Sequence, residues 1–286
     1  MLKWDVSESV AHFLVNKNNK AHMKTNLIVT FVVTTMLIPA AHASFINGDF
    51  ELGDTSGWTT GGGYRGYEFN STLAPSHYLP GGINYSPTLN HSAIVTQGIA
   101  PHTDGTLNQV YSGNYSFRAE DTTNGGYASA ITQTVTNYQD SNIFFAWAAV
   151  LEGAHGVNDA ATFQLTLTDL TDNVLLVDRK YNAASTGSGV DSRFTLSSDG
   201  YFYTDWQIEQ LTLTAAQIGH DFQLSLLAAD CEPTGHAGYV YLDGFGAALP
   251  PTNNVPEPST LALIGLGLLG FLRMSRRSTG HQFQKG

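Results

Sequence analysis

Residues 127–247 alternate between apolar and polar side chains with a period of two, and this pattern restricts the fold more than any other feature. Such alternation is typical of strands with one face in the core and the other in solvent. Turn clusters such as DTTNGG, LTDN and SSDG separate the alternating segments. The sole helical signal is one turn at Ala215–Ile218. The segments are Tyr127–Thr136, Asn142–Leu151, Ala161–Leu170, Asp205–Thr214, Asp221–Asp230 and Gly238–Ala247.

The pattern predicts an all-β protein whose body, residues 44–250, is a single jelly-roll β-sandwich. The stretch from Gly61 to Gly113 is rich in Gly, Pro, Asn, Ser, Tyr and His and shows few clean strands. We therefore expect long early loops at one edge of the sandwich. Cys231 is the only cysteine, so no internal disulfide can form, and stability must come from a packed core or bound metals.

Charge is distributed unevenly along the chain. Residues 44–258 hold five basic and 22 acidic side chains, a formal charge of −17. A body this acidic repels phosphate backbones, so nucleic acid is excluded as a partner. The same charge suits a cation, a neutral sugar, or solubility in an extracellular matrix.

Residues 23–43 have the three parts of a secretory signal peptide. Lys20 and Lys24 supply the positive start, 27–39 the apolar core, and Ala41-His42-Ala43 the small-x-small cleavage pattern. Cleavage would fall between Ala43 and Ser44, which implies export machinery and a signal peptidase as partners. Residues 1–22 are polar and unlike a signal peptide, so we interpret them as an over-extended translation start. For residues 23–43, the alternative to a signal peptide is an internal membrane helix.

The other end of the chain has a proline pair, a short apolar run and an arginine cluster. A linker, 251–258, ends in Pro256-Glu257-Pro258, and the uncharged run 259–272 follows. As a helix, 14 residues span about 21 Å, short of the ~30 Å hydrocarbon core. A helix from 255 to 274 is just long enough to span the hydrocarbon core, and the arginines would then lie on the cytoplasmic side. The predicted helix and its arginines cover residues 259–277, and residues 278–286 form a tail. The arginine cluster consists of Arg273, Arg276 and Arg277.

This ending, VPEPSTLALIGLGLLGFLRMSRRS, resembles the PEP-CTERM sorting signal of Gram-negative bacteria that make exopolysaccharide. The signal is also catalogued as an ice-binding-protein C-terminal domain. The resemblance implies an exosortase, a membrane protease-transpeptidase, as partner, with transient membrane insertion. It also implies delivery across the inner membrane to the envelope, the outer surface or the extracellular matrix. An ordinary tail anchor is the alternative.

Ice binding itself is not favoured by the sequence. Flat Thr-x-Thr rows can order water, and the chain has such rows at 134–136, 166–168 and 212–214. However, alternating Thr with an apolar residue is also what a half-buried strand looks like. The three rows have no fixed period, which argues against a solenoid.

The body begins SFINGDFELGDTSGW and ends GYVYLDGFGA, and this pair of motifs resembles the galactose-binding-like jelly rolls. These include family 4 and 9 carbohydrate-binding modules. The resemblance implies that Glu51 on a first strand and Asp243 on the last strand bind a structural Ca²⁺, which takes six to eight oxygen ligands. The sequence LDG departs from the usual second Asp or Asn and removes a ligand. The alternative is that both are exposed residues at a strand edge.

The segment before the last strand, ADCEPTGHAGYVYLD, concentrates Asp230, Cys231, Glu232 and His236 in seven residues. A zinc site needs more Cys or His at motif spacing. We therefore expect a buried cysteine and a loop histidine that packs against the last hairpin. The segment also resembles an ending found in many secreted bacterial surface proteins.

No catalytic motif is apparent: there is no Gly-x-Ser-x-Gly, no His-Glu-x-x-His and no phosphate-binding glycine loop. Aromatic rings in the early loops are more suggestive, because sugars stack on them; the alternative is that they pin the loops to the sandwich. The sequence thus predicts a non-enzymatic glycan-binding or structural component of exopolysaccharide. A secreted polysaccharide-active hydrolase and a purely structural adhesin are the alternatives. The rings are Trp58, Tyr64, Tyr67, Tyr78 and Tyr85.

Overall fold

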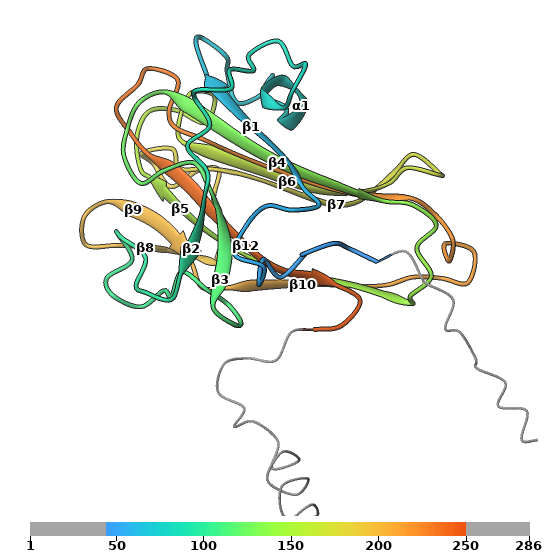
Figure 1. Ribbon diagram of the computed structural model, residues 1–286. Coiled ribbons are helices and arrows are strands. Elements are labelled where there is room, and N and C mark those ends of the chain that lie inside the picture. The colour runs from blue at the N-terminus through green and yellow to red at the C-terminus, as the bar shows by residue number, and fades with distance from the viewer. Residues whose placement is uncertain (1–43, 250–286) are drawn as a thin grey trace, which may run out of the picture. The chain divides into compact units, whose positions relative to one another are not determined.

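Two antiparallel sheets face each other across one core in the computed structural model, which describes residues 44–249 (Figure 1). This confirms the predicted all-β sandwich. The five-stranded sheet has the order β1 (Thr59–Tyr64), β4 (Tyr127–Val135), β11 (Phe222–Ala229), β6 (Thr162–Asp169), β7 (Val174–Asn182). The other sheet has the order β2 (Ala93–Thr96), β3 (Tyr115–Ala119), β12 (Gly238–Gly246), β5 (Asn142–Glu152), β9 (Tyr201–Thr204), β8 (Phe194–Leu196), and β10 (Gln207–Thr212) also pairs with β5.

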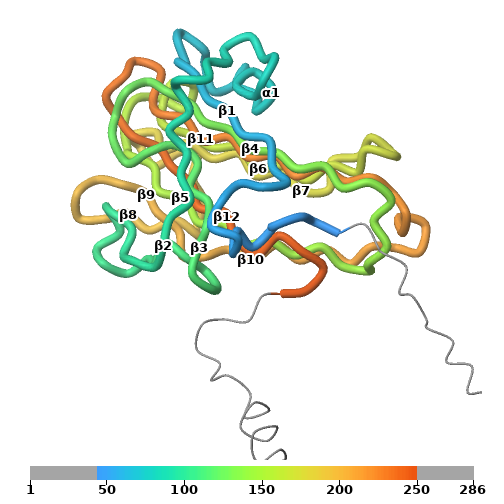
Figure 2. The backbone as a smooth tube through the Cα atoms, in the orientation of Figure 1, coloured from blue at the N-terminus to red at the C-terminus, as the bar shows by residue number. Residues whose placement is uncertain are grey.

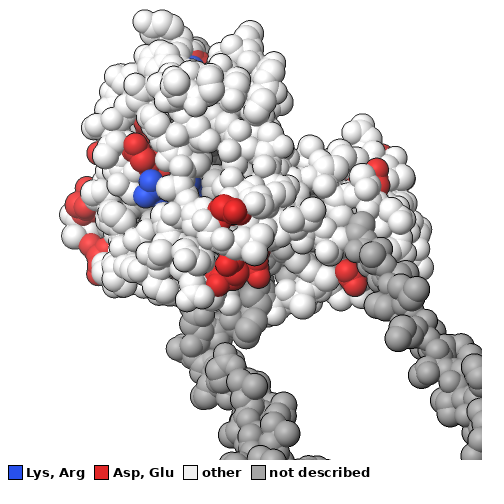
Figure 3. Space-filling model, viewed as in Figure 1, with Lys and Arg blue, Asp and Glu red and all other residues white. Residues whose placement is uncertain are grey.

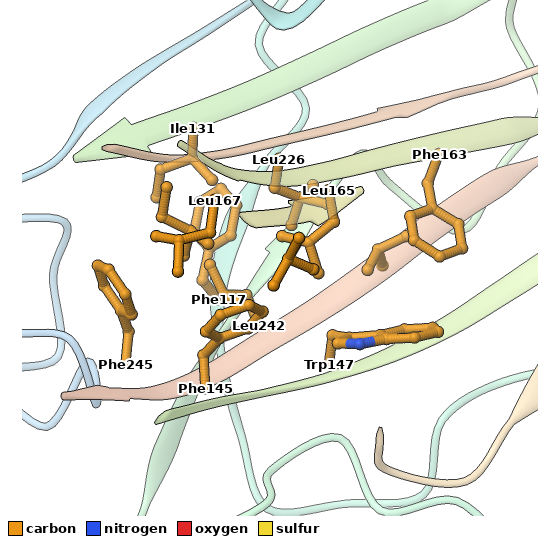
Figure 4. Close-up of a cluster of buried hydrophobic side chains, with 14 of the residues drawn as sticks. Phe117, Ile131, Phe145, Trp147, Phe163, Leu165, Leu167, Leu226, Leu242 and Phe245 are labelled. Carbon is orange, nitrogen blue, oxygen red and sulfur yellow. The ribbon is translucent and has the colours of Figure 1, made fainter. Parts of the chain in front are cut away.

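Consecutive strands cross between the two sheets, as in double-sheet jelly rolls. The chain passes from β4 to β5 to β6 and later from β11 to β12, changing sheet each time (Figure 2). Apolar side chains from both inner faces meet between the sheets (Figure 4). The residues labelled there include Ile131, Leu165 and Leu226 from one sheet and Phe145, Trp147 and Leu242 from the other.

Strand β5 departs from the predicted alternation, because its nine residues from Ile143 to Leu151 are all buried. The outer face of its sheet is covered by the chain between β2 and β3. Ala100 and Leu107 of that segment pack with Val150, Tyr239 and other apolar residues of the sheet. A strand covered on both faces reads as a continuous apolar run.

The early region holds more regular structure than the predicted loops. It contains β1, β2 and a one-turn helix α1 (Pro75–Tyr78). The sequence of β1, TTGGGY, has poor strand propensity because of its glycines. The structure explains them: a Cβ on Gly62 or Gly63 would collide with backbone carbonyls of the loop that covers the strand. Strands β3, β7, β8 and β9 were also not predicted, and 215–218 forms a turn rather than a helix.

The predicted targeting segments lie outside the described residues, with Ser44 as the first residue described. This applies to the signal peptide with Ala41 and Ala43 and to the apolar helix near the end. From 44 to 249, no helix is long and apolar enough to cross a membrane. On the face shown in Figure 3, acidic side chains form separate patches on a largely uncharged surface.

Candidate functional site

The motif at 47–51, where the resemblance implies a first strand, instead lies in two tight turns. Phe50 N donates to Asn47 O at 3.2 Å, and Gly53 N donates to Phe50 O at 2.9 Å. Asn47 and Phe50 have φ of 49° and 56°, in the left-handed region. The strand prediction is wrong here because these turns bury the Phe50 side chain and direct the Glu51 carboxylate toward the start of β3.

Glu51 is fixed by three hydrogen bonds from the segment that leads into β3. Its Oε1 accepts from Asn114 N at 2.7 Å and from Tyr115 N at 2.9 Å, and its Oε2 accepts from Asn114 Nδ2 at 3.0 Å. Gly113 beside it has a φ of 74°, and a Cβ there would collide with the carboxylate. The carboxylate is therefore held in one orientation with unused lone pairs.

Asp243 lies in the middle of β12 and is fully buried, which overturns the alternative that it is an exposed edge residue. Its Oδ2 accepts from Tyr111 N at 3.1 Å and from Ser112 N at 3.0 Å. Its Oδ1 has no hydrogen-bond partner. Burial raises the pKa of Asp243 to about 8, and the charge of Glu51 adds to this rise. A buried carboxylate oxygen without a partner is costly unless a cation or proton satisfies it.

A pocket of about 650 Å³ opens at this place, lined by residues of the first turns, the loop before β3 and the end of β12. Asp49, Glu51 and Gly244 are among its lining residues. Asp243 is not a lining residue but directly precedes Gly244, and its orphaned Oδ1 together with the Asp49 and Glu51 carboxylates offers the oxygen ligands that Ca²⁺ prefers. Glu51 and Asp243 thus fit the calcium prediction, which stays a prediction. A bound calcium ion would supply the positive charge that balances the buried carboxylate.

Exposed aromatic rings gather at the end of β1. Tyr67 is 91% exposed and Tyr64 is 49% exposed. The Tyr64 ring contacts the Tyr127 ring edge-on at 5.9 Å, and the His91 ring contacts Tyr127 at 4.5 Å. We call Tyr64, Tyr67, His91 and Tyr127 the tyrosine edge. Tyr64 of β1 and Tyr127 of β4 are paired at the edge of the five-stranded sheet, and Tyr67 follows β1 in a turn.

The other predicted aromatic residues have different roles. Tyr78 is fully buried and donates to Glu68 Oε2 at 2.8 Å, so the prediction that it is exposed for ligand binding is wrong. Its position on α1, against β1 and β4, buries it. Trp58 stacks on Phe50 at 5.2 Å and donates from Nε1 to Asn47 O at 3.0 Å, which pins the first turns to the core. Tyr85 is half-buried.

A buried carboxyl group, Glu120, lies beneath the tyrosine edge and was not predicted from the sequence. His91 Nδ1 lies 2.8 Å from its Oε1, and Ser129 Oγ donates to its Oε2 at 2.7 Å. Burial raises the pKa of Glu120 to about 7, against the opposing effect of the Ser129 hydrogen bond. Its φ of 63° is unusual for a side chain of this size. No local sequence signal marks this residue.

Glu120 is expected to make the protein less stable as pH rises from 5 to 8. Its pKa is 4.5 as a free side chain and about 7 when folded, so between pH 5 and about pH 7 the folded state holds a proton that the unfolded state has released. The free energy of unfolding then falls by up to about 1.4 kcal/mol per pH unit. Glu120→Gln should remove this part of the loss, measured by urea unfolding at pH 5 and pH 8. An equal loss in both proteins would contradict the assignment.

Arg65, also missed by the sequence analysis, joins three segments behind the tyrosine edge. The side chain is 1% exposed. Nε donates to Glu68 O at 2.9 Å and Nη2 to Asn70 Oδ1 at 2.6 Å. Nη1 donates to Ala160 O at 3.3 Å and to Asp230 O. Burial lowers the pKa of the Arg65 guanidinium. One buried cation thus ties the turn after β1 to the β5–β6 and β11–β12 loops.

The fold and the tail together define an exported β-sandwich protein with a removable sorting signal. Residues 254–277 match the PEP-CTERM protein-sorting motif, which contains Pro256, Glu257 and Pro258 and the arginine cluster. The motif makes an exosortase the processing partner and indicates export to the cell envelope or surface in a Gram-negative bacterium. The match covers the tail and does not assign a family to the sandwich. A search of curated proteins finds no match.

Solved structures resemble the sandwich only weakly. The carbohydrate-binding module TmCBM61, in complex with β-1,4-galactotriose, is 12% identical with a TM-score of 0.32, covering 71% of this chain and 95% of its own. CBM28, a carbohydrate-binding module specific for non-crystalline cellulose, is 14% identical with a TM-score of 0.33, covering 73% and 98%. An apo cyclase from Fischerella sp. is 12% identical with a TM-score of 0.36, covering 73% and 97%. These likenesses carry no argument about activity.

Proposed function

We propose that this protein is a non-enzymatic glycan-binding component of the exopolysaccharide matrix or cell surface, delivered there by its sorting tail. The observation that carries the proposal is the tyrosine edge, with Tyr67 almost fully exposed on a turn beside Tyr64. Isolated exposed apolar residues need no explanation, but a gathering of rings at the end of a rigid sandwich is typical of a binding surface.

The chemistry around these rings suits a neutral sugar. Ring faces stack on the C–H faces of pyranoses, and nearby polar groups can bond their hydroxyls. Asp121, whose Oδ2 lies 3.6 Å from His91 Nδ1, and Asn124, in the turn before β4, supply such groups. Among residues 44–249 acidic side chains greatly outnumber the five basic ones. This surface therefore favours uncharged glycans over anionic ones.

Calcium has a structural role in this proposal. Glu51 belongs to the first turns, Asp243 to β12, and the backbone that contacts both leads into β3. An ion held there would join the start of the body to its last strand and satisfy the orphaned Asp243 Oδ1. The tyrosine edge lies on other elements, so calcium would act on glycan binding through stability.

Replacing Tyr67 with alanine is expected to weaken glycan binding about 30-fold, near 2 kcal/mol, the typical effect of truncating a central aromatic contact. Tyr67→Phe keeps the ring and should retain most of the affinity. The measurement is retention of the full chain, purified in detergent, on the host's exopolysaccharide in affinity electrophoresis. Leu196→Ala, at a 59% exposed residue of β8, is the control and should bind normally.

Two results would overturn the proposal. If the wild-type chain is not retained, glycan binding is wrong and the protein is a structural adhesin. If it releases reducing sugar, it is a hydrolase. One observation favours the hydrolase as the second candidate function: the raised pKa of Glu120, which lies beneath the aromatic rings. Because Glu120 is fully buried, it does not reach a bound sugar in this conformation.

A further inference from the structure

Three side chains with nitrogen and sulfur ligand atoms converge where the β5–β6 loop meets the β11–β12 loop. Cys231 and His236 lie in the β11–β12 loop, the orange loop at the upper left of Figure 1. His155 lies in the β5–β6 loop, 81 residues before His236. The sequence alone shows one cysteine and one histidine here, which is too few for a metal site. The fold adds the third group.

The ligand atoms are close to one another. His155 Nε2 lies 3.0 Å from His236 Nδ1, and Cys231 Sγ lies 3.4 Å from the same His236 Nδ1. All three atoms lie within 4.8 Å of one another. The two imidazole rings meet edge-on, with centroids 4.7 Å apart at 79°. The three ligand atoms therefore form one compact cluster.

Backbone contacts hold both loops in this arrangement. Cys231 N donates to His236 O at 2.9 Å, which closes the β11–β12 loop and places its two ligand atoms side by side. His155 O accepts from Ser185 N at 3.1 Å and from Ser185 Oγ at 3.0 Å. Glu152 N donates to Ala237 O at 2.8 Å and joins the two loops at their base. The three groups are thus positioned before any ligand arrives.

This cluster differs from the other two groups of ligand-type side chains between residues 44 and 249. In those, a histidine faces carboxylates: His91 with Glu120 and Asp121, and His220 with Asp169 and Asp172. Hydrogen bonds between an imidazole and a carboxyl group account for these pairs. No carboxylate belongs to the group of His155, His236 and Cys231. The group of His155, His236 and Cys231 is instead held by hydrogen bonds among nitrogen and sulfur atoms, each of which is also a ligand atom for zinc-type metals.

We propose that His155 Nε2, His236 Nδ1 and Cys231 Sγ bind a thiophilic divalent metal ion of the zinc type. Zinc bonds of about 2.0–2.1 Å to nitrogen and ~2.3 Å to sulfur place tetrahedral ligand atoms roughly 3.3–3.6 Å apart. The two separations from His236 Nδ1, 3.0 Å and 3.4 Å, lie within a few tenths of an ångström of these values, and the separation between the other two ligand atoms is no more than 4.8 Å. The Cys231 thiol releases its proton when the metal binds.

The site has three protein ligands and faces solvent on one side, because His155 is exposed while Cys231 is buried. Zinc takes four ligands, so the fourth position is filled by water or by a group from a bound molecule. Imidazole and thiolate ligands select against Ca²⁺, which binds oxygen. This metal site is therefore independent of the calcium site and of the proposed glycan binding.

The test is metal binding by the full chain in detergent, with excess Ca²⁺ present. Zn²⁺ should bind with a stoichiometry of one by competition with a chromogenic chelator, and Co²⁺ should give a thiolate-to-metal charge-transfer band. Cys231→Ser should abolish that band. His155→Ala should weaken Zn²⁺ binding by more than the roughly 10–100-fold that loss of an outer-shell partner costs. His102→Ala, at a histidine paired with Asp199, is the control and should bind as wild type.

His155 is an exposed loop residue, so its variant is expected to fold, and an unchanged far-ultraviolet spectrum checks this. The proposal is overturned if wild type binds no zinc, if Ca²⁺ displaces the zinc, or if Co²⁺ bound to wild type gives no thiolate band. Glycan retention measured on the same variants separates the two proposals, since loss of zinc with normal retention supports the metal site alone.

Discussion

Replacement of Arg65 by methionine is expected to lower the free energy of unfolding by about 3–5 kcal/mol. The guanidinium donates to backbone carbonyls of Glu68, Ala160 and Asp230 and to the Asn70 side chain, and all of it is buried. Methionine fills a similar volume but donates no hydrogen bond, so the Glu68 and Asp230 carbonyl oxygens lose this donor, while Ala160 O keeps one from Asn70 Nδ2; each unsatisfied buried acceptor costs about 1–3 kcal/mol. Chemical unfolding monitored by tryptophan fluorescence measures the change.

Two further variants make the Arg65 result specific. Arg65→Lys keeps the charge but has one donor group in place of the planar fork, so it should recover only part of the lost stability. Lys180→Met removes an exposed cation and should change stability by less than about 0.5 kcal/mol. A loss below about 1 kcal/mol for Arg65→Met would mean that the three loops are held together by other contacts.

Removal of calcium by a chelator is expected to lower the melting temperature by about 5–10 °C. At a free concentration 100 times its Kd, a bound ion stabilises the folded state by about 2.7 kcal/mol. For a domain of this size, 1 kcal/mol corresponds to roughly 2–4 °C. Differential scanning calorimetry of the full chain, with calcium and with chelator, gives the shift.

Asp243→Asn tests whether the ion binds where the structure indicates. The variant keeps the side-chain volume and removes the charge, so its melting temperature should not respond to calcium. Without calcium it should be no less stable than wild type, because burial already raises the pKa of Asp243 to about 8 and disfavours its charged form. Asp191→Asn, at a partly exposed ion pair with Arg193, should keep the wild-type response. A calcium response in Asp243→Asn would place the ion elsewhere.

Local sequence patterns predicted β4, β5, β6, β10, β11 and β12 but missed β7 and β9, although both carry β-branched or aromatic residues. They failed at β1, where three glycines suppress strand propensity and the covering loop dictates their use. They also failed at Asn47–Glu51, where a motif typical of a strand forms turns. Strand β5 was predicted correctly, but the predicted alternation of buried and exposed residues is wrong, because a segment between β2 and β3 covers its outer face. In each case a distant segment outweighed local preference.

In the candidate sites too, local motifs identified some residues, but only the fold revealed their partners. Glu51, Asp243, Cys231 and His236 could be singled out because each lies in a short recognisable motif. Their partners could not: Tyr111 and Ser112 bind Asp243 from 132 and 131 residues away, and His155 reaches His236 across 81. Glu120 and Arg65 have no motif, and their significance comes from burial. Among the aromatic residues predicted to bind a ligand, Tyr78 is buried and cannot do so, whereas Tyr64 and Tyr67 are exposed.

The sequence by itself determined the all-β class and the sorting tail, because both are written in residues that are neighbours along the chain. Side-chain periodicity and the Pro-Glu-Pro, apolar and arginine order need no long-range contact to be recognised. The tertiary structure decided which loops meet, and with them the surroundings of Asp243, the tyrosine edge and the His155–Cys231–His236 cluster. The residues of these three sites come together because strands far apart in sequence pair with one another. Backbone pairing and burial then determine where each side chain lies, and local propensity has little influence.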